Sequence, residues 1–154
     1  MRKIFFLSFL AVSVFYFGCK SDAKIDDSSN LKVEESVDAQ TKQKAIDSAE
    51  YWLALIDSGN YGESWDEAAG IFKKAITKEK WVEAVENVRS NVGKYLKREI
   101  ISATYTKTLP GAPDGEYVVI QFNAKFEKKE KSTETITPMK DSDGKWHVSG
   151  YYIK

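Results

Sequence analysis

The chain has 154 residues with 23 basic and 23 acidic side chains, so its formal net charge is zero. That length fits one domain with its own hydrophobic core, and the even charge argues against a nucleic-acid-binding protein, which needs a concentrated basic face. A single cysteine excludes an intramolecular disulfide and a cysteine-rich zinc site.

The first residues have the pattern of a signal peptide. A basic start, Met1 to Lys3, is followed by an uncharged apolar run of 14 residues from Ile4 to Phe17. A helix of that length measures about 21 Å, which is shorter than the roughly 30 Å hydrocarbon core of a bilayer. Residues 1–18 are therefore predicted to be a signal peptide rather than a stable membrane span.

The only cysteine, Cys19, lies directly after this run and is preceded by Gly18. This arrangement resembles the lipobox of bacterial lipoproteins, although Tyr16 and Phe17 differ from the residues usual at their positions. The resemblance implies that Cys19 is alkylated with diacylglycerol, becomes the first mature residue and is acylated on its amine. The alternative is an ordinary secretory peptide followed by a free thiol.

The segment after the cysteine predicts a flexible tether, so residues 19–39 are assigned to a lipidated cysteine and its tether. From Lys20 to about Asp38 it has few apolar residues and many Ser, Asp, Glu and Lys. Such a composition buries too little surface to offset the entropy of ordering the chain. As a coil it would span roughly 25 Å. It is either a spacer that lifts the domain off the bilayer or a leader without a selected length.

Three helices are predicted next, each from apolar residues at helical spacing. The first begins near Gln40 and ends before Gly59, the second begins near Tyr61, and the third follows Thr77 as N-cap and stops at Gly93. Their apolar stripes are Ala45, Ala49, Trp52 and Ile56; Trp65, Ala68, Ala69, Phe72 and Ile76; and Trp81, Val85, Val88 and Val92.

The second half alternates with period two, which indicates four antiparallel strands. Pro138 restricts its strand to a sheet edge or a bulge, and Gly144 is placed in a hairpin turn at a position that needs positive φ. The faces predicted to point inward carry Ile101, Ala103 and Tyr105; Val118, Ile120, Phe122, Ala124 and Phe126; and Trp146, Val148, Gly150 and Tyr152. The predicted fold class is α+β, with three N-terminal helices on one face of a four-stranded antiparallel sheet.

Residues 45–154 resemble the bacterial DUF4019 family, whose function is not assigned. The resemblance rests on "WLALIDSGNYGESWD", "LPGAPDGEYVVIQF", "ETIT" and "DGKWHVSGYYIK". The helix pair followed by a meander is also similar to the broader NTF2-like and cystatin-like architectures. These resemblances imply a small secreted or anchored α+β domain over residues 40–154, and they carry over no catalytic residues.

The residue pattern gives little sign of catalysis. His147 is the only histidine and is expected to be structural or exposed, and no set of metal ligands or cofactor motif is visible. The charged run from Lys125 to Glu134 is expected to be a solvated hairpin end, with contact to lipid headgroups as the alternative. Five aromatic residues are expected to be core, with the lining of a ligand pocket as the alternative: Trp52, Trp65, Trp81, Phe122 and Trp146.

The sequence thus predicts a lipid-anchored protein of the bacterial cell envelope, facing the periplasm or the exterior. Its domain is expected to bind an envelope protein or a small ligand without cofactor, and not to bind nucleic acid; its oligomeric state is left open. Two alternatives remain: an enzyme with an NTF2-like pocket, and a purely structural spacer.

Overall fold

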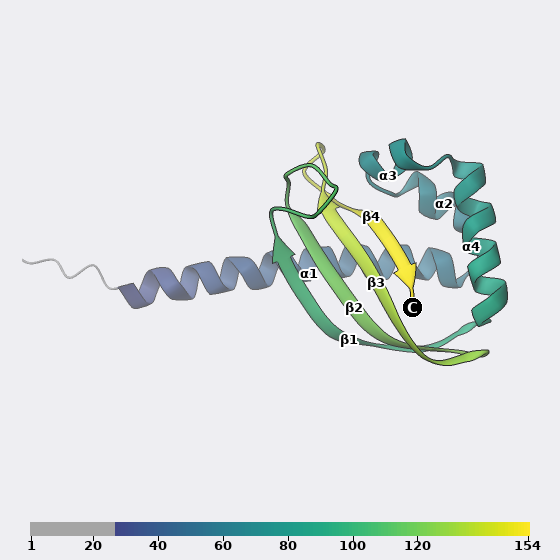
Figure 1. Cartoon of the computed structure of the whole chain (residues 1–154). Helices are drawn as coiled ribbons and strands as arrows, with labels where there is room; N and C mark the ends of the chain where they lie inside the picture. Colours follow the sequence, from purple (N-terminus) through teal and green to yellow (C-terminus); the bar gives the residue numbers. More distant parts are fainter. Residues whose placement is uncertain (1–26) are drawn as a thin grey trace, which may run out of the picture.

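The computed structural model describes the backbone of residues 27–154 and the side chains of residues 38–154. The predicted signal peptide, Gly18, Cys19 and the first part of the predicted tether lie outside the described residues. The described chain forms an α+β fold, in which helices pack on a four-stranded antiparallel sheet (Figure 1).

The first helix, α1, runs from Asp27 to Asp57 and is longer than predicted. The sequence predicted coil to about Asp38 and a helix only from about Gln40. The backbone instead is helical from Asp27, because extending an existing helix adds a hydrogen bond for each residue fixed and needs no new nucleus. The segment is also rich in Glu, Lys, Gln and Ala, which are good helix formers. Its N-terminal part projects beyond the sheet (Figure 1).

The second predicted helix is two short helices, α2 (Tyr61–Asp66) and α3 (Gly70–Ala75). Tertiary hydrogen bonds interrupt it: the Ala69 N–H donates to the Val148 carbonyl at 2.9 Å, and the Gly70 N–H donates to Asp141 Oδ2 at 2.7 Å. These partners replace the carbonyls of the preceding turn, and a glycine weakens the helix there. The prediction of three helices was therefore wrong at this point.

The predicted third helix is α4 (Lys78–Val92), and both of its ends are as predicted. Thr77 accepts a hydrogen bond from the Lys80 N–H, and Gly93 ends the helix with φ of +78°. A Cβ at Gly93 would lie 2.9 Å from Glu127 Cβ, so the turn into the sheet has no room for a side chain.

The buried stripe of α4 differs from the prediction at one position. Trp81, Val85 and Val92 are buried, but Val88 is 38% exposed and Arg89 is buried in its place. Arg89 lies four residues after Val85 and therefore on the same face of the helix. The reason for its burial is a set of charged partners on other elements, described below.

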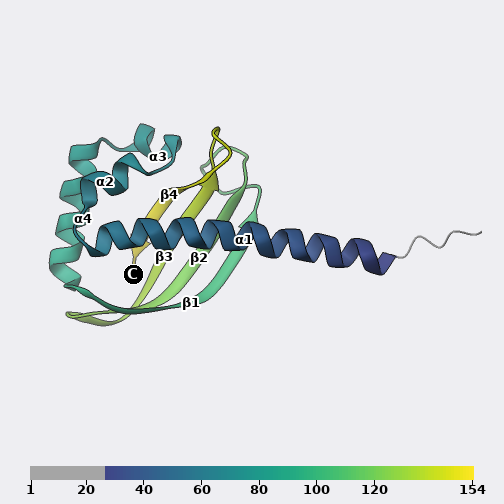
Figure 2. The same cartoon turned by 180° about the vertical axis from the view of Figure 1, so that it is seen from behind.

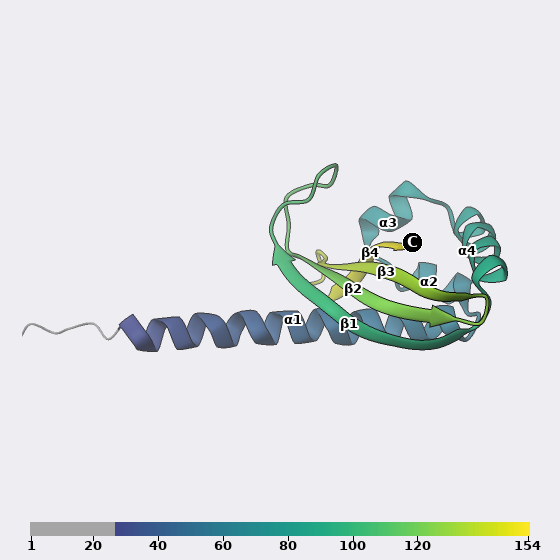
Figure 3. The ribbon, with the colours of Figure 1, turned by 60° about the horizontal axis from the view of Figure 1, so that its bottom comes forward.

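The strands follow one another across the sheet in the order β1 (Tyr95–Thr106), β2 (Tyr117–Phe126), β3 (Lys129–Lys140) and β4 (Trp146–Ile153). The sheet is curved, and the connection between β1 and β2 projects from one end (Figure 3). The inward face of β2 is as predicted, with Val118, Ile120, Phe122, Ala124 and Phe126 all buried. Gly144 has φ of +77° in the β3–β4 turn, also as predicted.

Bulges turn one residue of each of two predicted strand faces outward, whereas Ala103, Tyr105, Trp146 and Val148 lie inward as predicted. In β1 the register shifts between Ile100 and Ser102, and Ile101 is 55% exposed rather than inward. In β4, Gly150 pairs with Thr137 but Val148 pairs with Pro138, so Ser149 is the extra residue. The alternation predicted Tyr152 on the inner face, but after this bulge Tyr151 packs against the core and Tyr152 is 49% exposed.

Pro138 lies beside this second bulge. Its strand, β3, is paired with β2 on one side and with β4 on the other. The predicted bulge is therefore confirmed, and the alternative of a sheet edge is wrong. A proline has no N–H to donate to a ladder, and the register shift at Thr137 and Pro138 accommodates that loss.

The main core lies between α1 and the sheet, with α2, α3 and α4 closing one end (Figure 2). Helix α1 crosses the sheet and contacts all four strands. Its buried residues are Ala45, Ala49, Trp52, Leu53, Leu55 and Ile56, which include the predicted stripe. No helix within residues 27–154 is both long and apolar enough to cross a membrane.

Candidate functional site

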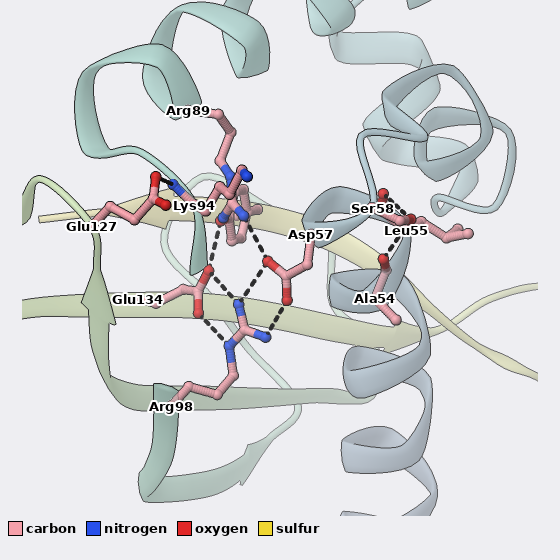
Figure 4. Close-up of polar contacts among 10 residues, drawn as sticks. Ala54, Leu55, Asp57, Ser58, Arg89, Lys94, Arg98, Glu127 and Glu134 are labelled. Atoms are coloured by element: carbon pink, nitrogen blue, oxygen red, sulfur yellow. Dashed lines mark hydrogen bonds and ion pairs between the residues drawn. The ribbon is translucent and has the colours of Figure 1, made fainter. Parts of the chain in front are cut away.

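Four charged side chains from four elements meet where α1 ends (Figure 4). Asp57 closes α1, Arg89 comes from α4, Arg98 from β1 and Glu134 from β3. Arg98 donates to Glu134 Oε2 from Nε at 2.6 Å and to Asp57 Oδ2 from Nη1 at 2.7 Å. Arg89 Nη2 donates to Asp57 Oδ1 at 2.8 Å. We call these four residues the ion cluster.

The ion cluster is neutral and largely removed from solvent. The Glu134 side chain is fully buried, and the side chains of Arg89, Arg98 and Asp57 are 7%, 12% and 18% exposed. Buried charges need opposite charges beside them because each loses its hydration. The two arginines also lie near the C-terminal end of α1, where positive charge is favoured by the helix dipole.

Local structure holds Asp57 in place. The Ser58 hydroxyl donates to the carbonyl oxygens of Ala54 at 2.8 Å and Leu55 at 3.0 Å, which satisfies two of the last carbonyls of α1 (Figure 4). The chain then turns sharply, and the Asn60 N–H returns to the Leu55 carbonyl. Asp57 is therefore fixed on the last turn of the helix, facing the sheet.

The pairing changes the pKa of two groups. Burial by itself lowers the pKa of Arg98, but its hydrogen bonds with Asp57 and Glu134 outweigh this effect and raise the pKa above the ordinary value. Tyr151 donates from its hydroxyl to Glu134 Oε1 at 2.6 Å. Burial, together with the negative charge of Glu134, raises the pKa of this tyrosine well above its usual range. The phenol is thus held in its protonated form.

A cleft of about 380 Å³ opens beside the ion cluster. Asp57 and Arg89 form part of its wall, and the turn after α4 and the β2–β3 turn complete it. The Lys94 N–H donates to Glu127 Oε2 at 2.9 Å, which joins these two turns (Figure 4). The complete lining is Asp57, Tyr61, Glu86, Arg89, Ser90, Gly93, Lys94, Glu127 and Lys128. We call this space the Arg89 cleft.

Sequence reasoning missed the ion cluster. Glu134 was assigned to a solvated charged run. It lies two residues before the buried Ile136 and therefore on the same, inner face of β3. Arg89 likewise falls on the buried stripe of α4. The periodicity of the buried positions could have indicated both residues. Because they are charged, they were interpreted as solvent-exposed. The solvated interpretation was therefore wrong for Glu134.

The five aromatic residues predicted as core or pocket lie within or against the main core. Trp52, Trp81 and Phe122 are buried, whereas Trp65 and Trp146 are partly buried against the same cluster. Trp52 and Trp81 make edge-to-face contacts with Phe72 and Tyr151 at centroid distances of 4.9 to 6.4 Å. Some also reach a surface: Trp81 borders a cleft of about 230 Å³, and Trp52 and Trp146 border one of about 290 Å³.

His147 contacts two segments outside its own strand. Its Nδ1 lies 3.0 Å from the Glu67 carbonyl oxygen, and its Nε2 lies 3.0 Å from Asp143 Oδ2. The ring therefore connects β4 with the segment after α2 and with the β3–β4 turn. Over the part of the chain that the structure describes, no group of three or more His, Cys, Asp or Glu residues is arranged to hold a metal ion.

Fold and site together define a small α+β domain in which a long helix crosses one face of an antiparallel meander and the core encloses an ion cluster. A family model described as "Protein of unknown function (DUF4019)" matches residues 48–151. The chain therefore belongs to the DUF4019 family, as its sequence predicted. No curated protein matches the chain.

Proposed function

We propose that the protein is a lipid-anchored component of the bacterial cell envelope whose DUF4019 domain is a non-enzymatic binding module. The anchoring part is supported by the sequence: a basic start, an apolar run too short to span a bilayer, and Cys19 directly after Gly18. Several acyl chains on one cysteine would give stable attachment, since each buried methylene contributes about 0.8 kcal/mol.

The observation that carries the proposal is the length and course of α1. The helix has 31 residues, which corresponds to about 46 Å, and its first buried residue in the described part is Ala45. The N-terminal part of the helix leads away from the sheet (Figure 1). A helical extension of this kind suits a spacer between a lipidated cysteine and a domain held off the membrane.

The filled space between the helices and the sheet argues against an enzyme pocket of the NTF2-like kind at that place. In an enzyme of the NTF2-like kind, the space between helices and sheet would hold reactive groups accessible to a substrate. Here that space contains the aromatic rings of Trp52, Phe72, Trp81 and Tyr151. The finer assignment to an NTF2-like or cystatin-like architecture belongs to the same proposal, and it rests on helices followed by a four-stranded meander.

Mass spectrometry and fractionation of the full chain test the anchor. We expect the mature protein to begin at Cys19, to carry acyl mass and to fractionate with membranes. Cys19→Ala should release the protein or leave its precursor uncut, whereas Ser21→Ala, a nearby matched change, should have no effect. An unmodified mature protein in the soluble fraction would contradict the proposal.

A further inference from the structure

We propose that the Arg89 cleft binds the carboxylate group of a small ligand, with the Arg89 guanidinium as the main recognition group. The inference deepens the binding role proposed above and rests on it. It starts from an unused hydrogen-bond donor: Arg89 Nη1 is buried and has no hydrogen-bond partner among the residues whose side chains are described. Arg89 is only 8% exposed and forms part of the wall of the cleft.

The other contacts of Arg89 do not use this donor. Nη2 donates to Asp57, and Cζ lies 5.1 Å above the centroid of the Phe126 ring. A guanidinium placed over a ring engages it with its flat face, whereas its N–H groups lie in its own plane. A buried N–H without an acceptor is unfavourable, because it has lost its hydrogen bonds to water and gained none. Because Arg89 lines the cleft, an acceptor that enters there and reaches the guanidinium would remove that cost.

The charges around the cleft favour a carboxylate over a doubly charged anion. Asp57 is already shared by two arginines. The remaining ionised groups of the lining are Lys94 and Lys128 against Glu86 and Glu127, so they balance. The C-terminal end of α4, with its partial negative charge, also borders the cleft. A phosphate dianion would find no net positive charge in this lining to offset its second charge, whereas one carboxylate charge matches the one guanidinium.

The size of the cleft fits a small molecule or the end of a chain. Its volume of about 380 Å³ lies at the lower end of the range for small-ligand sites. Guanidinium and carboxylate form paired, directional hydrogen bonds. The carboxylate could belong to a simple organic acid, to a free amino acid or to the end of a peptide. An amino group on the ligand would find Glu86 or Glu127 at the rim.

Titration of the purified full chain with defined probes tests the proposal. Acetate, glycine and glycylglycine are the carboxylate probes, and acetamide and glycinamide are matched probes without a carboxylate. Binding is followed by NMR at the Arg89 Nε–H and at the backbone N–H of Lys94, at constant ionic strength. We expect saturable shifts with the carboxylates only, and the order of the three affinities identifies which source the site prefers.

Exposed lining residues make the test independent of folding. Lys94→Ala and Lys128→Ala should each weaken carboxylate binding by about two- to five-fold, and Glu86→Gln should strengthen it by a similar factor, because an exposed charge contributes up to about 1 kcal/mol. Lys125→Ala is the matched control, since Lys125 is also exposed but pairs with Glu130 away from the cleft. Arg89→Met should abolish saturable binding, with circular dichroism showing whether the variant is folded.

Two results would overturn the proposal: equal responses to acetate and acetamide, or carboxylate binding unaffected by Lys94→Ala, Lys128→Ala and Glu86→Gln. If Arg89→Met does not fold, these three variants still decide. Repeating the titration with Cys19→Ala separates this inference from the anchor. If the wild-type chain is not lipidated but binds carboxylates, only the anchor is refuted. If the wild-type chain is lipidated but does not bind carboxylates, only the proposal for the cleft is refuted.

Discussion

The hydroxyl of Tyr151 offers a specific test of the ion cluster, because Tyr151→Phe removes one oxygen and leaves the ring. That oxygen donates to Glu134, whose side chain is fully buried, at 2.6 Å. Glu134 would keep its two hydrogen bonds from Arg98, and the ring would keep its edge-to-face contacts with Trp52 and Trp81. The expected change is therefore the loss of one hydrogen bond to a buried charge.

A hydrogen bond to a charged group contributes about 1.5 to 3 kcal/mol, and we expect Tyr151→Phe to lower the free energy of unfolding by that amount. In urea, where the slope for small proteins is about 1 to 3 kcal/mol per molar, the midpoint should fall by about 1 M. Tyr152→Phe is the matched control: it is the same chemical change on the next residue, which is 49% exposed. It should leave the midpoint unchanged.

The same variant has a distinct pH dependence. Because burial and Glu134 raise the pKa of Tyr151 in the folded state, the stabilisation from this group is complete below the ordinary tyrosine pKa of about 10. It is lost as the pH rises above that value, where the unfolded chain ionises first. The free energy of unfolding of the wild-type protein should therefore fall more steeply in that range than that of Tyr151→Phe. The difference between the two free energies should narrow. Equal midpoints for wild type and Tyr151→Phe at neutral pH would refute the reasoning.

Two further tests concern the core and a tertiary helix cap. Phe122→Ala and Trp81→Ala should each cost about 3 to 5 kcal/mol in urea unfolding because both rings are buried; a wild-type midpoint for Trp81→Ala would place that ring in a pocket rather than in the core. Asp141→Ala should cost about 1 kcal/mol at neutral pH because Asp141 accepts the Gly70 N–H. That hydrogen bond, and then the one from Ser142, lowers the pKa of Asp141, so the difference should disappear as the pH falls below about 4. Thermal unfolding across this range checks the cap, and a cost equal to that of exposed Asp114→Ala would contradict it.

Periodicity alone determined much of the fold. The alternation in β2 placed Val118, Ile120 and Phe122 on the buried face, and Thr77 and Gly93 marked both ends of α4. These signals are local: a strand alternates and a helix repeats whatever surrounds it. The family was also readable from the sequence, and the family model matches residues 48–151.

Tertiary structure decided the features that depend on partners distant in sequence. The break between α2 and α3 follows from acceptors on Val148 and Asp141, and the exposure of Tyr152 in place of Tyr151 follows from a bulge in β4. The ion cluster is the clearest case. A charged residue on an apolar face is stable only if its counter-charge arrives from another element, and the burial of Glu134 depends on Arg98 lying 36 residues earlier. One sequence contains the pattern of each element but not their pairing, so the cluster and its cleft emerge only when α1, α4, β1 and β3 are assembled.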